Sequence, residues 1–167
     1  MHTALIALGA NLGDPLATLQ RAIDRLSRDR HVHSWRCSDL YCTSPVSSIP
    51  QSNYWNGVLL LRTREPPWML FSRLKRVERF LGRTRPKQRD VARHVDLDFL
   101  WSSQLTSKTP YLQLPHPRML ERRFVLVPLL ELVPALPGLP SLQDALAACP
   151  SEQRILDRHR LGKKKAP

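Results

Sequence analysis

Two aspartates, Asp96 and Asp98, interrupt the apolar segment 95–101 and are the residues of this sequence best suited to hold a metal ion. In a strand, residues i and i+2 project from one face roughly 6.6 Å apart, so both carboxylates would point together while Leu97 packs on the other side. Two unpaired carboxylates repel and aspartate is a poor strand former, so a divalent cation is the expected partner. An oxygen-only ligand set favours Mg²⁺ over zinc. The alternative is an acidic outer strand face that neighbouring arginines neutralise.

A strongly basic segment precedes the aspartates. Residues 73–93 contain nine Lys or Arg against only Glu78 and Asp90, a local excess of +7 within a total net charge of +12. Guanidinium groups bind phosphate in a fixed fork geometry, and two Mg²⁺ ions on one carboxylate pair can bridge a triphosphate. In isolation the same segment would be interpreted as a solvated basic loop. Beside the two acids, it indicates phosphoryl chemistry.

Length and composition limit the organisation of the chain. With 167 residues, 42% of them hydrophobic, the chain is long enough for one domain with a core and too short to promise two. We predict a single domain over residues 1–160 and a basic tail over 161–167, which is expected to be disordered. The net charge admits nucleic acid, an anionic membrane or an anionic small substrate as partner.

The termini and cysteines indicate the compartment. The N-terminal apolar stretch is too short for a signal or membrane helix, so we expect a cytoplasmic protein without a membrane partner. The three cysteines, Cys37, Cys42 and Cys149, have no metal-ligand spacing, and their odd number argues against a disulfide framework. We predict buried thiols.

Hydrophobic periodicity predicts an alternating order of elements. Asp14 followed by Pro15 is typical of a capped helix start, and Gly82 of a helix end. The expected elements are a strand at 3–8, a helix to about residue 28, strands at 32–41 and 54–63, a helix at 66–81 and a strand through Asp96. This is the order of the ferredoxin-like βαββαβ unit, an α+β fold. Residues 121–132 and 141–148 are expected to add short C-terminal helices. The helix at 66–81 is expected to carry an apolar stripe on one side, formed by Met69, Leu70, Leu74, Val77, Phe80 and Leu81.

Two further groups of residues could bind a ligand. Tyr54 and Asn56 share one strand face, and an aromatic beside a side-chain amide suits a flat heterocycle, although aromatics are core residues by default. His116 lies between Pro115 and Pro117, which restrict its backbone. A rigid turn would also explain that sequence.

Taken together, these motifs resemble the 6-hydroxymethyl-7,8-dihydropterin pyrophosphokinase family over residues 3 to about 135. The resemblance rests on the order and spacing of residues 8–14 (Leu-Gly-Ala-Asn-Leu-Gly-Asp), 54–56 (Tyr-Trp-Asn), 82–85 (Gly-Arg-Thr-Arg), Arg93 with 96–98 (Asp-Leu-Asp), 115–118 (Pro-His-Pro-Arg) and 122–129. It implies a monomeric ferredoxin-like enzyme of folate biosynthesis. Such an enzyme moves the terminal pyrophosphate of ATP to the pterin hydroxymethyl group and releases AMP.

The resemblance also implies a role for each matching residue. Asp96 and Asp98 would bind two Mg²⁺ ions and act in catalysis with Arg83 and Arg93. The implied ATP contacts are Arg83, Arg85, Arg89, Arg93, Phe99, His116 and Arg122. The implied pterin contacts are Thr43, Pro45, Val46, Tyr54, Asn56 and Phe124, with Tyr54 and Phe124 on either side of the ring.

The sequence departs from the family in one loop. Where the family has Arg-Trp-Gly-Pro-Arg, residues 89–93 read Arg-Asp-Val-Ala-Arg, so Asp90 replaces an aromatic of the loop that closes over the substrates. Phe99 is also bulkier than the usual aliphatic residue, which would alter the adenine pocket. One alternative is therefore a diverged relative that binds pterin or nucleotide with weak or no transfer activity. Another is a basic RNA-binding domain, but the aromatic-rich RNA-binding strand motif is absent, so we expect no nucleic-acid partner.

Overall fold

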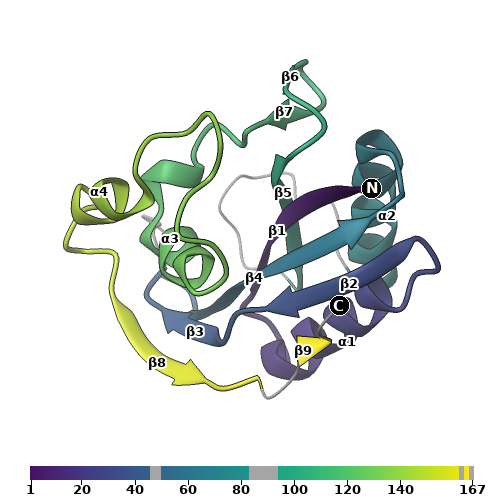
Figure 1. Ribbon diagram of the computed structural model, residues 1–167. Coiled ribbons are helices and arrows are strands. Elements are labelled where there is room, and N and C mark those ends of the chain that lie inside the picture. Colours follow the sequence, from purple (N-terminus) through teal and green to yellow (C-terminus); the bar gives the residue numbers. More distant parts are fainter. Residues whose placement is uncertain (46–49, 83–93, 162–163, 166–167) are drawn as a thin grey trace.

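The computed structural model describes residues 1–45, 50–82, 94–161 and 164–165 (Figure 1). Several residues that the sequence analysis selected lie outside these ranges. They are Val46, Arg83, Arg85, Arg89 and Arg93, together with the altered loop around Asp90.

A ferredoxin-like unit forms the centre of the molecule. It consists of β1 (His2–Ala10), α1 (Pro15–Ser27), β2 (Val32–Cys37), β4 (Tyr54–Thr63), α2 (Pro67–Phe80) and β5 (Asp96–Ser102). The four strands lie in the order β5-β1-β4-β2, and all neighbours are antiparallel. The predicted α+β class and βαββαβ order are confirmed. This order places β1, with Gly9 at its end, between Asp96 on β5 and Asn56 on β4.

The segment predicted as one strand at 32–41 is two strands. It breaks at Ser38, whose backbone N–H donates to Val58 O at 3.0 Å and whose Oγ accepts from Val58 N at 2.9 Å. After the break, β3 (Leu40–Thr43) pairs with the first residues of β4, so that Thr43 lies opposite Tyr54. The prediction missed the break because a serine inside a strand pattern does not reveal where its hydroxyl will bond.

Helices cover both faces of the sheet (Figure 1). On one face lie α1 and α2; on the other lie a short 3₁₀ helix, η1 (Met119–Glu121), and helices α3 (Arg123–Leu130) and α4 (Leu142–Ala147). The predicted cap of α1 is confirmed, because Asp14 Oδ1 accepts from Ala17 N at 3.0 Å and Pro15 is the first helical residue. The predicted short C-terminal helices are also confirmed.

The apolar stripe expected on α2 was partly wrong. Met69 and Phe80, both expected on its inner side, are 37% and 65% exposed. Arg73 and Glu78 are buried on that helix instead. A charged side chain can occupy an inner position when a partner of opposite charge is buried with it, and residue type alone does not report that partner.

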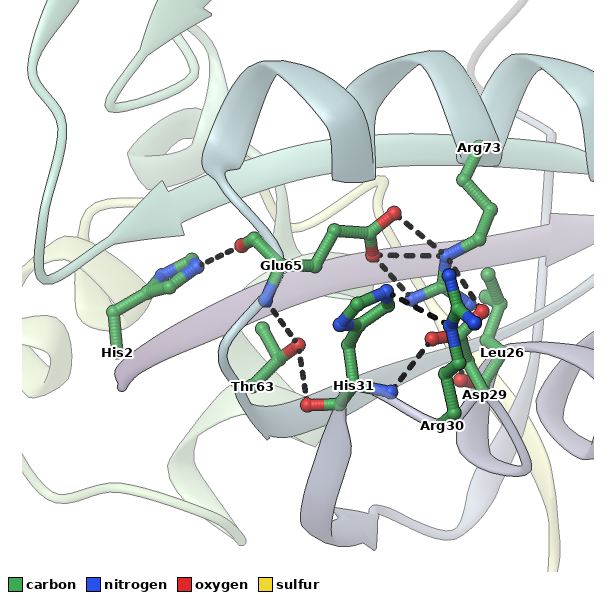
Figure 2. Close-up of polar contacts among 8 residues, drawn as sticks. All are labelled: His2, Leu26, Asp29, Arg30, His31, Thr63, Glu65 and Arg73. Atoms are coloured by element: carbon green, nitrogen blue, oxygen red, sulfur yellow. Dashed lines mark hydrogen bonds and ion pairs between the residues drawn. The ribbon is translucent and has the colours of Figure 1, made fainter.

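The partner of Arg73 is Glu65, which follows β4 (Figure 2). The Nε atom of Arg73 donates to both carboxylate oxygens of Glu65 at 3.2 and 2.9 Å, and Nη2 lies 2.7 Å from Oε2. Nη1 of Arg73 donates to Leu26 O at 3.1 Å, and Asp29 Oδ2 lies 3.8 Å from Nε of Arg73. This cluster ties α2 to the end of α1 and to the sheet.

The C-terminal third adds a separate two-stranded sheet and further strands of the main sheet. A hairpin of β6 (Ser107–Lys108) and β7 (Gln113–Leu114) follows β5, and β8 (Ile155–His159) pairs with β3. Lys164 and Lys165 form β9 beside β2, whose edge offers unpaired backbone groups for this pairing. Disorder of the tail at 161–167 stays a prediction.

Two further findings concern the sequence predictions. All three cysteines are free and buried, as predicted. Within the described ranges, the helices lack the length and apolar character that a membrane crossing needs.

Candidate active site

Asp96 and Asp98 lie on β5 at the wall of a cavity of about 220 Å³. Both residues are half-buried, whereas Leu97 between them is fully buried in the core. The alternation matches the strand geometry that the sequence predicted. The two carboxylates therefore face the same space.

Two side chains of α2 hold the backbone between these carboxylates. Leu97 N donates to Glu78 Oε1 at 2.7 Å, and Lys75 Nζ donates to Leu97 O at 3.2 Å. Lys75 and Glu78 also form an ion pair at 3.1 Å. The short bond to a buried carboxylate is charge-assisted, and it fixes the peptide that carries both aspartates.

Arg122 brings positive charge to this site. Its Nη1 lies 3.8 Å from Asp98 Oδ2, and its guanidinium carbon lies 5.5 Å from the centre of the Phe124 ring. Arg118, just before η1, and Arg122, at the junction between η1 and α3, both line the cavity. Acidic and basic groups therefore meet in one cavity, an arrangement that suits a phosphate and its metal ion.

His116 lies on the other side of Asp98. Its backbone N–H donates to Leu100 O at 2.7 Å, and Arg118 N donates to its Nδ1 at 3.2 Å, which leaves Nε2 as the protonated nitrogen of the neutral ring. Burial is the largest cause and lowers the pKa of His116; the charge of Asp98 opposes this shift, and that of Arg122 adds to it. The imidazole is therefore neutral at pH 7 and can donate through Nε2.

Four of the six residues expected to bind pterin lie at the same cavity. Thr43, Tyr54, Asn56 and Phe124 all line it. The buried Asn56 donates through Nδ2 to Thr43 Oγ1 at 2.8 Å, and Tyr54 donates to Gln51 Oε1 at 2.8 Å.

Gly9 lies against this group on the neighbouring strand. A Cβ atom at position 9 would lie 3.1 Å from the side-chain oxygen of Asn56. A side chain at position 9 would press on this amide by a few tenths of an ångström, so glycine leaves Asn56 in its place at this wall.

A second, more open cavity lies on the far side of Asp98. It is lined by Phe71, Lys75, Asp98, Phe99, Pro110, Tyr111, Leu112, Gln113, His116 and Pro117. Phe99 and His116, both expected to contact ATP, therefore lie together here, although Phe99 is 3% exposed and packs in the core. The two cavities share Asp98.

One expected residue among those that the structure describes lines neither cavity, and several residues that line the first cavity were not predicted from the sequence. Pro45 is half-buried and does not line the cavity. The residues that line it without having been selected include Ser44, Gln51, Arg118 and Gln153. Ser44 follows Thr43, Gln51 lies three residues before Tyr54, and Arg118 ends the motif at 115–118, so proximity to selected residues was a usable signal. No comparable signal in the sequence pointed to Gln153.

The carboxylates suit Mg²⁺. Among the described residues, no three His, Cys, Asp or Glu side chains come together as a ligand set. Mg²⁺ is usually held by one or two carboxylates, with substrate phosphates and waters completing its octahedron. Asp96 and Asp98, beside Arg122, provide such an oxygen-only, incomplete set.

Comparisons with known proteins find relatives of this chain in one enzyme family. The sequence model of the 7,8-dihydro-6-hydroxymethylpterin-pyrophosphokinase (HPPK) family matches residues 5–134. A 2-amino-4-hydroxy-6-hydroxymethyldihydropteridine pyrophosphokinase of Pseudomonas aeruginosa is 37% identical over 149 residues, which cover 88% of this chain and 91% of the relative. The Bacillus subtilis protein of the same name is 38% identical over 131 residues, 78% of each chain.

Solved structures show the same fold. A crystal structure of an HPPK-DHPS protein in complex with substrates superposes with a TM-score of 0.66 at 13% identity, and covers 88% of this chain. The chain spans only 43% of the length of that protein. The HPPK-DHPS of Plasmodium falciparum gives a TM-score of 0.63. The segment that matches the family model contains every motif of the cavity up to α3. This chain therefore belongs to the 7,8-dihydro-6-hydroxymethylpterin-pyrophosphokinase family.

Proposed function

We propose that the cavity holds both substrates of the family reaction, with the phosphates of ATP at Asp96 and Asp98 and the pterin at Tyr54 and Asn56. The chain is a pyrophosphokinase of folate biosynthesis that transfers pyrophosphate from ATP to 6-hydroxymethyl-7,8-dihydropterin and releases AMP. One observation carries the assignment of sites: the carboxylate pair and the amide-aromatic group line a single cavity. The acceptor hydroxyl and the phosphate can therefore meet within it.

The reaction forms a bond from the hydroxymethyl oxygen to the β-phosphorus and breaks the bond from that phosphorus to the oxygen that leaves with AMP. The hydroxyl proton is released. Mg²⁺, when bound, would neutralise phosphate charge. Asp96 and Asp98 would hold it, and Arg122 and the Nε2–H group of His116 would bind phosphate oxygens. Because this transfer needs little covalent chemistry from the protein, positioning and charge stabilisation are its main contributions.

The pterin side of the cavity provides shape and hydrogen bonds. Tyr54 and Phe124 offer aromatic surfaces for a flat ring, and the amide of Asn56 offers a donor and an acceptor for its edge. The bond from Asn56 to Thr43 fixes the orientation of that amide. A rigid, oriented amide discriminates between heterocycles because a mismatched ring leaves it unpaired.

The metal assignment predicts that Asp96→Asn and Asp98→Asn each abolish transfer while the fold survives. Each change removes a ligand charge without altering shape, so phosphate charge is left uncompensated. Mg²⁺-dependent AMP release from ATP with added pterin measures turnover, and titration of Mg²⁺ with a non-hydrolysable ATP analogue measures metal affinity. Asp24→Asn on α1, outside the cavity, is the matched control. Wild-type turnover in either site variant would disprove the assignment.

The pterin assignment predicts that Asn56→Ala weakens pterin binding much more than ATP binding. One lost hydrogen bond corresponds to roughly 0.5–1.5 kcal/mol, or about 2- to 13-fold in affinity. Calorimetry with each ligand separates the two effects. Asn53→Ala is the matched control, because Asn53 is an exposed residue just before β4, the strand of Asn56, and lies outside the cavity lining. Equal losses for both ligands would argue against this pocket.

The same assays address the remaining alternatives. A diverged relative with weak transfer would bind both ligands but release AMP slowly. Family membership favours the enzyme over an RNA-binding domain. A monomeric state and a cytoplasmic location stay predictions, which light scattering of the purified protein and cell fractionation test.

A further inference from the structure

The segment after α4 returns to the cavity from the far end of the chain, running past β3 as β8 (Figure 1). Its residue Gln153 is half-buried and lines the cavity together with Asn56 and Phe124. Gln153 lies outside residues 5–134, which the family model matches. No role for it follows from the motifs.

The side chain of Gln153 forms two hydrogen bonds to the backbone at the junction between η1 and α3. Its Oε1 accepts from Arg123 N at 2.7 Å, and its Nε2 donates to Glu121 O at 3.0 Å. Arg122, between these two backbone groups, is extended (φ −117°, ψ 108°) and provides no side-chain cap for α3. Gln153 thus satisfies a free amide at the start of a helix, the function that a capping residue serves within the chain.

The residues on either side of Gln153 hold the opposite wall. Ser44 Oγ donates to Glu152 O at 3.3 Å, and Ser44 N donates to Arg154 O at 3.3 Å. Ser44 follows Thr43, whose hydroxyl accepts from Asn56. Residues 152–154 therefore join the strand end that carries Thr43 to the helix start that carries Phe124.

The segment is anchored independently of Gln153. The pairing of β8 with β3 sets Ile155 opposite Thr43, and Arg158 forms an ion pair with Asp39 at 2.6 Å. Leu161 N also donates to Asp39 Oδ1 at 3.0 Å. Because these contacts remain when the Gln153 side chain is shortened, the segment should stay docked in such a variant.

We propose that Gln153 is a positioning residue for pterin binding. It fixes the backbone around Arg122, and so the place of the Phe124 ring at the cavity wall, while its neighbours fix Ser44 and Thr43 on the other wall. The inference rests on the proposed function, because it takes the occupant of this part of the cavity to be the pterin. It assigns a role at the binding site to the C-terminal segment.

The test compares Gln153→Ala, Gln153→Glu and the control Gln143→Ala, which removes an exposed glutamine of α4 outside the cavity lining. Calorimetry measures 6-hydroxymethyl-7,8-dihydropterin binding in the presence of α,β-methylene ATP, and binding of that analogue alone. We expect Gln153→Ala to weaken pterin binding about tenfold and analogue binding less than about threefold, consistent with two lost neutral hydrogen bonds. Gln153→Glu should recover part of the loss, since its carboxylate still accepts from Arg123 at a helix N-terminus. The control should match wild type.

Unchanged pterin affinity in Gln153→Ala would overturn the inference, as would equal losses for both ligands, which indicate a general structural role. Asn56→Ala in the same series separates this result from failure of the proposed function. If Asn56→Ala weakens pterin binding and Gln153→Ala does not, the pterin site stands and the positioning role is wrong. If neither does, the pterin site itself is wrong, and the inference falls with it.

Discussion

Glu78 offers a test of how firmly the fold must hold the two aspartates. Its buried carboxylate accepts from Leu97 N at 2.7 Å, between Asp96 and Asp98. Glu78→Ala leaves this amide without its acceptor, which costs roughly 1.5–3 kcal/mol for a hydrogen bond to a charged group. The ion pair with Lys75 adds little, because the Lys75 side chain is 37% exposed.

The cost converts to a measurable shift in the unfolding midpoint. An unfolding entropy of about 2.1 cal/mol/K per residue amounts to ~0.35 kcal/mol/K for this chain, so Tm should fall by about 4–9 °C. At 20 °C the variant should remain folded. Its turnover should nevertheless fall about tenfold or more, because displacing catalytic groups by a fraction of an ångström misaligns the reacting atoms.

The matched control is Glu65→Ala. Glu65 is also a buried glutamate that accepts charge-assisted bonds, but it lies outside the cavity lining (Figure 2). We expect this variant to lose at least as much stability and to keep wild-type turnover at 20 °C. Scanning calorimetry and AMP release measure the two properties. If Glu78→Ala lowers Tm as expected but turns over like the Glu65 variant, the anchoring of β5 by α2 is not needed for catalysis.

Three further predictions follow from buried groups. Arg73→Met should cost about 3–5 kcal/mol in denaturant unfolding, because Glu65 becomes an unpaired buried charge; a cost below about 1 kcal/mol would show that the pair is dispensable. Burial raises the pKa of the Cys37 thiol to about 12, so a thiol reagent at pH 8 should label it only after unfolding, and rapid labelling of the native protein would contradict this. Burial lowers the pKa of His116 in the folded state below the value of about 6.5 that it has in the unfolded state. Between these two pKa values the unfolded state binds more protons, so the stability of the folded state is lost as the pH falls from about 6.5 toward the folded-state pKa. His116→Gln should flatten this dependence in urea titrations across pH, and an unchanged slope would refute the assignment.

Local signals predicted the parts of the fold that depend on neighbouring residues. The cap of α1 by Asp14 and the shared face of Asp96 and Asp98 are set by helix and strand geometry, which the sequence displays directly. The family resemblance added residues far apart in the chain, such as Asn56 and Phe124, and both line the cavity.

Predictions failed where a distant partner decides the outcome. Met69 and Phe80 were expected in the core because they are apolar, yet Arg73 and Glu78 are buried on α2, each with a partner outside that helix. Gln153 was not selected at all. Its role depends on backbone atoms about 30 residues earlier in the chain, and no periodicity or motif encodes such a contact.

By itself, the sequence determined the order of helices and strands, the strand that carries the two carboxylates and the excess of positive charge beside it, because each depends on residue type and short-range spacing. Only the tertiary structure decided that β3 would turn Thr43 toward Asn56, that Arg122 would reach Asp98, and that the C-terminal segment would close the wall between them. Those contacts depend on strand pairing across the sheet. The order of elements limits the possible pairings, but the hydrogen bonds and packing of the whole fold select among them.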